Sequence, residues 1–149
     1  MKIGTLLGIS ILLLASFGFL CAAQGKPEKT EPASDYSELE KAPAKYRAKP
    51  NPLAKDKDSI PAGKILFEEH CAECHGETAS GTKKAPSLRA QEIQTAAPGA
   101  LFWILSNGIV RKGMPVWSKL PEPQRWQLVS FIQSLGPAEA AENKTTAKP

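Results

Sequence analysis

Three stretches of the chain space their apolar residues three and four positions apart, as a helix with one buried face requires: residues 61–70, 98–107 and 121–135. Prolines open all three stretches. Glycine follows the second and the third, at Gly108 and Gly136, where a left-handed backbone conformation ends a helix. We expect Ser59 to cap the first helix. No stretch alternates apolar and polar residues as a half-buried strand does, so the sequence predicts a small all-α domain over residues 59–137.

The connection between His75 and Pro98 lacks a long apolar pattern and is expected to be a loop with one short helical turn around Gln91–Thr95. Three short helices joined by such loops bury little apolar surface. Domains of this size commonly depend on disulfides, metals or cofactors. A large apolar cofactor would supply the missing core.

The two ends of the chain differ from this domain. Residues 1–23 carry one charge, an apolar run and the ending Cys21-Ala22-Ala23, which is typical of a signal peptide cut after Ala23. Two alternatives are a retained membrane anchor and lipidation of Cys21. Residues 24–58 hold eight basic residues, seven acidic residues and five prolines, which predicts a disordered charged linker. Residues 138–149 are predicted to be a disordered tail.

The densest chemistry lies in "HCAECHGE", residues 70–77, which contains two of the three cysteines and both histidines of the chain. The spacing C-x-x-C-H is that of a covalent haem c. Two thiols three positions apart reach the two vinyl groups of one porphyrin edge, and the histidine after the second thiol binds the iron. Cys71, Cys74 and His75 are therefore the predicted attachment residues, with His75 as an iron ligand.

Three other uses of this motif compete with haem attachment. A thioredoxin-like redox pair would need a βαβ setting, which the sequence lacks. A structural zinc site needs four ligands well placed around a tetrahedron, and the only candidate beyond the motif, His70, is the immediate neighbour of Cys71. A plain disulfide suits an exported protein but leaves His75 without a role.

The sixth position of a haem iron has few candidate ligands in this chain. His70 precedes Cys71 directly, so it lies on the segment that holds the attachment site and cannot easily reach the opposite haem face; a packing role suits it better. Met1 lies in the leader. Met114, in Gly113-Met114-Pro115, is the predicted second iron ligand, although a lone methionine also serves to fill a core. A thioether favours reduced iron and raises the reduction potential.

From Pro61 to Leu135 the chain resembles a class I cytochrome c of the short bacterial type with a single haem. The residues that carry the match are Gly63, Phe67, Cys71-Ala72-Glu73-Cys74-His75-Gly76, Pro86-Ser87-Leu88, Asn107-Gly108, Met114-Pro115-Val116-Trp117 and the segment from Trp126 to Leu135. The resemblance implies a small cytochrome c fold, with three main helices packed around one covalently attached haem.

The resemblance also implies particular contacts. The first and last helices should cross closely, with Gly63 allowing the approach and Phe67 filling the contact against the face of Val129 and Ile132. The carbonyl of Pro86 should accept a hydrogen bond from the second ring nitrogen of His75 and fix its orientation. Ala85 stands where the family often has glycine. Trp117 lies near a haem propionate or fills the core.

The domain has eight basic and six acidic residues, a surplus too small for nucleic-acid binding. The pairs Lys83-Lys84 and Arg111-Lys112 lie in loops expected to flank the haem and could steer an acidic partner. Because both iron positions would be filled, we expect no enzyme activity. The predicted function is a monomeric, periplasmic one-electron carrier that exchanges electrons with redox protein partners and meets a membrane only through its N-terminal segment.

Two other functions are weighed against the carrier. One is a haem c subunit of a membrane-associated dehydrogenase or terminal oxidase. The other is a ligand-binding haem sensor or peroxidase-like enzyme, which requires Met114 to leave the iron. Carbon monoxide binding to the reduced protein would favour the second alternative.

Overall fold

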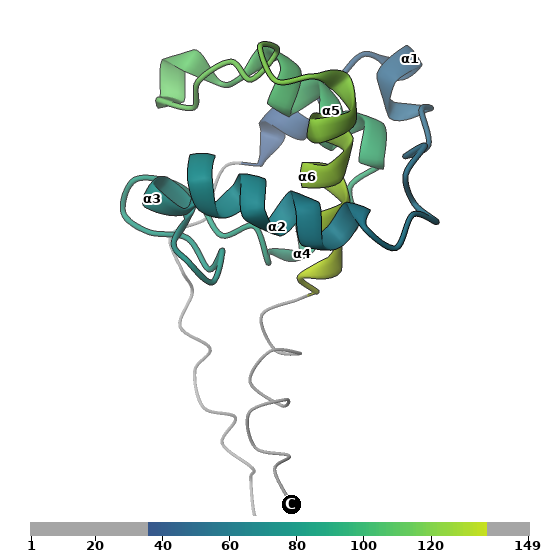
Figure 1. Cartoon of the computed structure of the whole chain (residues 1–149). Helices are drawn as coiled ribbons and strands as arrows, with labels where there is room; N and C mark the ends of the chain where they lie inside the picture. The colour runs from purple at the N-terminus through teal and green to yellow at the C-terminus, as the bar shows by residue number, and fades with distance from the viewer. Residues whose placement is uncertain (1–35, 137–149) are drawn as a thin grey trace, which may run out of the picture. The chain divides into compact units, whose positions relative to one another are not determined.

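Helices α2 (Ser59–His70) and α6 (Glu122–Ser134) cross in close contact at the centre of the fold, as Figure 1 shows. The computed structural model describes residues 36–136 of the chain. A Cβ atom added to Gly63 would lie 2.0 Å from the backbone oxygen of Gln127, so only glycine permits this approach. One turn later the rings of Phe67 and Phe131 pack with centroids 5.2 Å apart. The expected crossing is present, and its ring contact is with Phe131, beside the expected face of Val129 and Ile132.

Six shorter or peripheral elements surround this pair: η1 (Ser37–Leu39), α1 (Ala44–Arg47), α3 (Ala72–His75), α4 (Gln91–Gln94), α5 (Pro98–Asn107) and η2 (Val110–Lys112). Helix α5 packs on α6, where Phe102 stacks on Trp126 with ring centroids 4.2 Å apart. The core is formed by side chains from α2, α4, α5 and α6, together with Ala79. Among residues 36–136 there is no strand; a single antiparallel bridge joins Ile109 to Met114. The all-α prediction is confirmed.

Helix boundaries follow the predicted pattern except at two places. Helix α2 begins at Ser59, two residues before the predicted start, and Ser59 does not cap it. The Ser59 hydroxyl instead donates to the carbonyl of Asp56 at 2.8 Å, and the residue is 2% exposed. Helix α3 forms from the attachment motif itself. Four residues are too few for an apolar periodicity to reveal such a helix.

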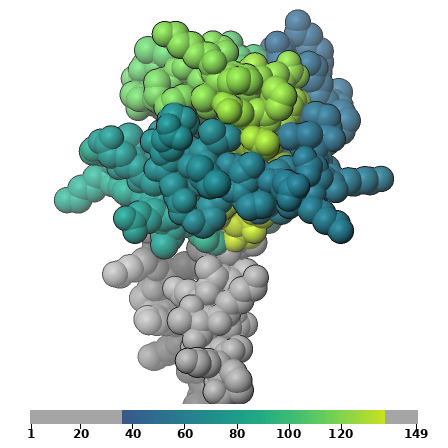
Figure 2. All heavy atoms as spheres, viewed as in Figure 1, coloured from purple at the N-terminus to yellow at the C-terminus, as the bar shows by residue number. Residues whose placement is uncertain are grey.

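The structure differs from the disordered linker expected over residues 24–58, because residues 36–58 fold onto the domain. The Asn51 side chain donates to the Ser130 hydroxyl of α6 at 2.8 Å. A Cβ atom on Gly99 would lie 1.8 Å from the backbone oxygen of Tyr46, so the segment lies directly against α5. In Figure 2 the segment, in blue, packs against the rest of the domain. Composition predicted disorder because charged residues and prolines dominate the segment. Its few large apolar side chains, among them Leu39, Tyr46 and Leu53, nevertheless pack against the core.

The predicted signal peptide (1–23), the first part of the linker (24–35) and the tail (138–149) lie outside the described residues. Within residues 36–136, no helix has both the length and the apolar character needed to cross a membrane.

Candidate functional site

The C-x-x-C-H motif forms a single turn at the end of α2. Cys71 ends α2 and directly precedes α3, and its carbonyl oxygen accepts hydrogen bonds from the backbone N–H groups of Cys74 (3.1 Å) and His75 (2.9 Å). Both cysteines are partly exposed free thiols. One short helical turn therefore carries both thiols and the imidazole, as attachment along one edge of a porphyrin requires.

His75 is oriented by the backbone of the following loop. Its Nδ1 atom lies 2.9 Å from the carbonyl oxygen of Pro86. A carbonyl only accepts hydrogen bonds, so Nδ1 carries the proton and donates it. Burial lowers the pKa of His75, and the bond to Pro86 offsets part of that shift. The ring is therefore neutral near pH 7, with the lone pair of Nε2 available for a metal.

Hydrogen bonds fold the loop that contains Pro86 back onto the motif. The Thr82 hydroxyl donates to the Cys74 carbonyl at 2.5 Å, and the Gly81 N–H donates to the His75 carbonyl at 2.9 Å. Gly81 has φ +84°, and a Cβ atom there would lie 2.6 Å from the backbone nitrogen of Ser87. Ala85, where the family often has glycine, keeps its carbonyl bonded to the N–H of Thr82 at 2.8 Å. The Pro86 contact that the resemblance implied is therefore present with alanine at that position.

Met114 sits at the base of a tight backbone hairpin. The N–H of Ile109 donates to the Met114 carbonyl at 3.0 Å, and the N–H of Met114 donates back at 3.2 Å. Gly113 has φ +87°, a conformation that favours glycine. Met114 is half-buried and packs against the same core as Cys71, Leu88 and Trp117, which are also partly buried. The structure thus brings residues of both ligand loops to the margin of one apolar core.

The second histidine packs against an aromatic ring. The rings of His70 and Trp117 have centroids 5.2 Å apart. The backbone N–H of Trp117 donates to the Leu105 carbonyl at 3.0 Å. This contact agrees with a packing role for His70. Sequence reasoning overlooked Thr82, whose hydroxyl ties the loop to Cys74, because one polar residue in a loop gives no periodic signal.

Three of the four basic residues expected to steer a partner have carboxylate partners. Lys84 Nζ lies 2.8 Å from Glu73, and this hydrogen bond holds the pKa of Glu73 below its ordinary value. Arg111 and Lys112 both approach Glu38. Pairing with a carboxylate reduces the field of each cation, so the steering surface is weaker than the sequence suggested.

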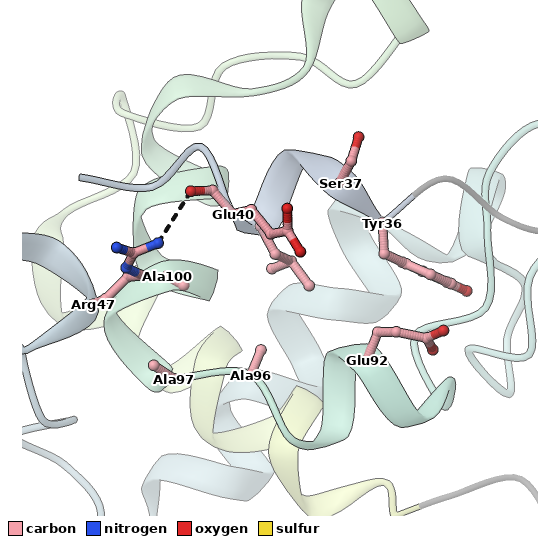
Figure 3. A pocket seen from close by; sticks show the side chains of 9 residues that line it. Tyr36, Ser37, Glu40, Arg47, Glu92, Ala96, Ala97 and Ala100 are labelled. Carbon is pink, nitrogen blue, oxygen red and sulfur yellow. Dashed lines mark hydrogen bonds between the residues drawn. The ribbon is translucent and has the colours of Figure 1, made fainter. Parts of the chain in front are cut away.

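A cleft of about 530 Å³ lies elsewhere, between the N-terminal segment and the α4–α5 region (Figure 3). Its polar rim includes Arg47, whose guanidinium donates to the Glu40 carbonyl at 3.1 Å. None of the five residues predicted to bind haem lines this cleft. Its place in the fold separates it from the C-x-x-C-H turn.

The helical fold, the two thiols on one turn and the anchored histidine define a c-type cytochrome. Residues 58–132 match the family model described as cytochrome c oxidase, cbb3-type, subunit III, and the chain belongs to this cytochrome c family. The matched domain is therefore a haem c domain whose chemistry is electron transfer. Among the described residues, no three His, Cys, Asp or Glu side chains gather closely enough to hold a metal ion, whereas a structural zinc site takes four ligands.

Individual relatives match the chain to different extents. The cbb3-type cytochrome c oxidase subunit CcoP of Azospirillum sp. (strain B510) is 32% identical over 96 residues, which cover 58% of this chain and 32% of that protein. The chain thus spans about a third of the length of the CcoP relatives it matches. Cytochrome c550 of Pseudomonas aeruginosa is 29% identical over 143 residues, covering 90% of this chain and 96% of the relative.

A solved structure shares the fold. The crystal structure of cytochrome cL from the marine methylotrophic bacterium Methylophaga aminisulfidivorans superimposes with a TM-score of 0.52 at 24% identity, and the match covers 85% of each chain. The predicted resemblance to class I cytochromes c is therefore confirmed, both by family and by fold.

Proposed function

We propose that this protein is a periplasmic one-electron carrier with a single haem c, covalently attached through Cys71 and Cys74. His75 and Met114 are the proposed iron ligands. The observation that most supports this assignment is the 2.9 Å hydrogen bond from His75 Nδ1 to Pro86, which leaves Nε2 as the ring nitrogen available to iron. The haem, when bound, supplies exchange of one electron between Fe(II) and Fe(III).

The chain's own residues hold and tune this group. The thiols of Cys71 and Cys74 bond to the two vinyl groups, so that the cofactor stays attached when the protein opens locally. The Pro86 carbonyl keeps the His75 ring oriented, with the proton on Nδ1 and the Nε2 lone pair free for iron. Met114 offers a thioether, which favours the reduced state. With both iron positions taken, no site is left for a substrate, and electron exchange with redox protein partners is the proposed activity.

The proposed location depends on the N-terminal residues. An apolar run followed by Cys21-Ala22-Ala23 supports export and removal of residues 1–23. Lipidation of Cys21 or retention of the segment would instead hold the protein at the membrane. The mass of the N-terminal peptide from protein isolated from the native cells separates these three outcomes.

Absorption spectroscopy of the mature protein tests the ligand assignment. Oxidised wild-type protein should show a sulfur-to-iron charge-transfer band, and Met114→Ala should lose that band while keeping its haem. A band that survives the substitution would remove Met114 from the iron. Carbon monoxide should bind the reduced Met114→Ala variant but not the reduced wild type, because only the variant has an open position.

A second candidate function is a haem c subunit of a terminal oxidase. The family description and the partial matches to CcoP proteins favour it. The match along 96% of cytochrome c550 favours a protein with one haem domain, and for this reason we place the carrier first. Purification from native membranes discriminates the two: a subunit copurifies with oxidase polypeptides, whereas a carrier is recovered as a monomer.

A further inference from the structure

We propose that Glu38 is a positioning residue for the second iron ligand: through its ion pair with Arg111 it holds the hairpin that carries Met114. This role depends on Met114 being the iron ligand proposed above. Glu38 lies 73 residues before Arg111, in the segment that the sequence predicted to be a disordered linker. The segment would then limit the movement of the Met114 hairpin, and we call this role of the Glu38–Arg111 ion pair the brace.

Glu38 is a largely buried carboxylate with three cationic neighbours. Its side chain is only 11% exposed, which is low for a carboxylate, and a carboxylate in such a place requires cationic or hydrogen-bonding partners. Lys41 Nζ lies 2.8 Å from Oε1, the Arg111 guanidinium donates to the same oxygen, and Lys112 Nζ is 4.0 Å away. The Arg111 side chain is 66% exposed, so the buried end of this ion pair is the carboxylate of Glu38.

The hairpin connects Arg111 rigidly to Met114. Its tip is η2 (Val110–Lys112), and the Lys112 N–H donates to the Ile109 carbonyl at 2.8 Å. The Gly113 N–H donates to the Val110 carbonyl at 3.0 Å, and Ile109 pairs with Met114 in both directions. A constraint on Arg111 therefore acts on Met114 through the hydrogen-bonded backbone of Lys112 and Gly113.

The segment that carries Glu38 also contacts the loop that orients His75. The Tyr36 hydroxyl donates to the carbonyl of Ser87 at 2.9 Å, next to the Pro86 carbonyl that holds His75. Residues 36–38 therefore contact both ligand loops, which lie far apart in the sequence. The hydrogen bond from Asn51 to Ser130 also attaches the N-terminal segment to α6.

Because the Glu38–Arg111 ion pair holds the hairpin, it lowers the population of protein in which Met114 has left the iron. An external ligand binds only that open population, so its apparent affinity rises in proportion to the open fraction. Removing the charge on Glu38 should free the tip of the hairpin. We expect imidazole to bind the oxidised protein up to about fivefold more tightly when the ion pair is broken, the upper end of the range for a partly exposed ion pair.

The test measures imidazole affinity of the oxidised holoprotein in wild type, Glu38→Gln, Arg111→Gln and the double variant. Arg111→Gln changes an exposed side chain and gives the answer even if Glu38→Gln fails to fold. Glu68→Gln is the matched control, since Glu68 pairs with Lys64 on the outer face of α2. The double variant should bind no more tightly than the tighter single variant, because both substitutions break one interaction.

The outcomes separate this inference from the proposed function. Tighter imidazole binding in the Glu38 and Arg111 variants, with Glu68→Gln within about twofold of wild type, supports the brace. Equal affinities in all variants of a protein that shows the sulfur-to-iron band would overturn the brace and leave Met114 ligation standing. A wild type without that band would overturn both. If the Glu38 and Arg111 substitutions only reduced overall stability, the unfolding midpoint would fall, but the effects of the two single substitutions on imidazole affinity would add in the double variant. That result would also overturn the brace.

Discussion

The Nδ1 atom of His75 donates a hydrogen bond to the carbonyl oxygen of Pro86, eleven residues later, across 2.9 Å. This contact fixes which ring nitrogen can bind iron and which way the ring faces. Its acceptor is a backbone atom, so its position depends on the fold of the loop and not on the proline side chain. We therefore expect the residues that shape this loop to control the orientation of the His75 ring.

Thr82→Val removes the hydroxyl that ties this loop to the carbonyl of Cys74 at 2.5 Å while keeping the shape of the side chain. The same hydroxyl accepts from the N–H of Lys84 at 3.0 Å, so two hydrogen bonds are lost. We expect the free energy of unfolding of the holoprotein to fall by about 1–2 kcal/mol. Denaturant titration measures it. Thr78→Val is the control, because that hydroxyl bonds only to the exposed Ser80 side chain, and the change should be within about 0.5 kcal/mol. Equal losses in the two variants would show that the Thr82 bond does not shape the loop.

Gly63→Ala should destabilise the protein strongly. The added Cβ would lie 2.0 Å from the backbone oxygen of Gln127, so α2 and α6 must move apart. We expect a loss of about 3 kcal/mol in unfolding free energy, as for an overpacked core. Ile65→Ala, on a side chain that is 64% exposed on the same helix, should cost less than about 0.5 kcal/mol. A harmless Gly63→Ala would mean that the two helices do not approach this closely.

Asn51→Ala tests whether residues 36–58 belong to the folded domain. The amide is buried and donates to Ser130, while its oxygen accepts from the N–H of Leu53 at 2.8 Å. Losing these bonds should cost about 2 kcal/mol in unfolding free energy. The control Asn107→Ala removes an exposed amide with one bond to Trp103 and should cost about 0.5 kcal/mol. A disordered linker would instead tolerate Asn51→Ala without any change.

The ion pairs of Glu38 predict a dependence of stability on pH. Hydrogen bonds from Lys41 and then Arg111 hold the pKa of Glu38 below the ordinary value of 4.5. A carboxyl whose pKa is lower in the folded state stabilises the fold above the unfolded-state value, and this contribution disappears as the pH falls through the folded-state value. The unfolding midpoints of wild type and Glu38→Gln should therefore differ at pH 7 and converge in acid below pH 4.5. A difference that stays constant with pH would contradict the ion pairs with Lys41, Arg111 and Lys112.

The sequence predicted the parts of the fold that depend on repeated or spaced residues. Helix α5 (Pro98–Asn107) has both of its predicted ends, because Pro98 and Gly108 are strong signals and the apolar spacing between them is regular. The C-x-x-C-H spacing indicated the haem domain, and the family match agrees with it. These signals lie within short stretches of the chain, so one sequence without an alignment is enough to find them.

The missed features depend on contacts between distant residues. Nothing near Asn51 in the sequence shows that its amide meets Ser130, 79 residues away, so composition alone indicated disorder. The pairing of Glu38 with Arg111 is equally non-local. Ser59 resembled a cap because capping residues are recognised by type and position, but its hydroxyl serves the preceding turn through Asp56.

The central claim is one haem joined covalently to Cys71 and Cys74. Its most direct test is the intact mass of the purified mature protein after acid denaturation and extraction with organic solvent. We expect a mass equal to that of the polypeptide plus one haem, with the pigment retained by the protein. A mass equal to that of the bare polypeptide, with the pigment in the organic phase or absent, would contradict the claim.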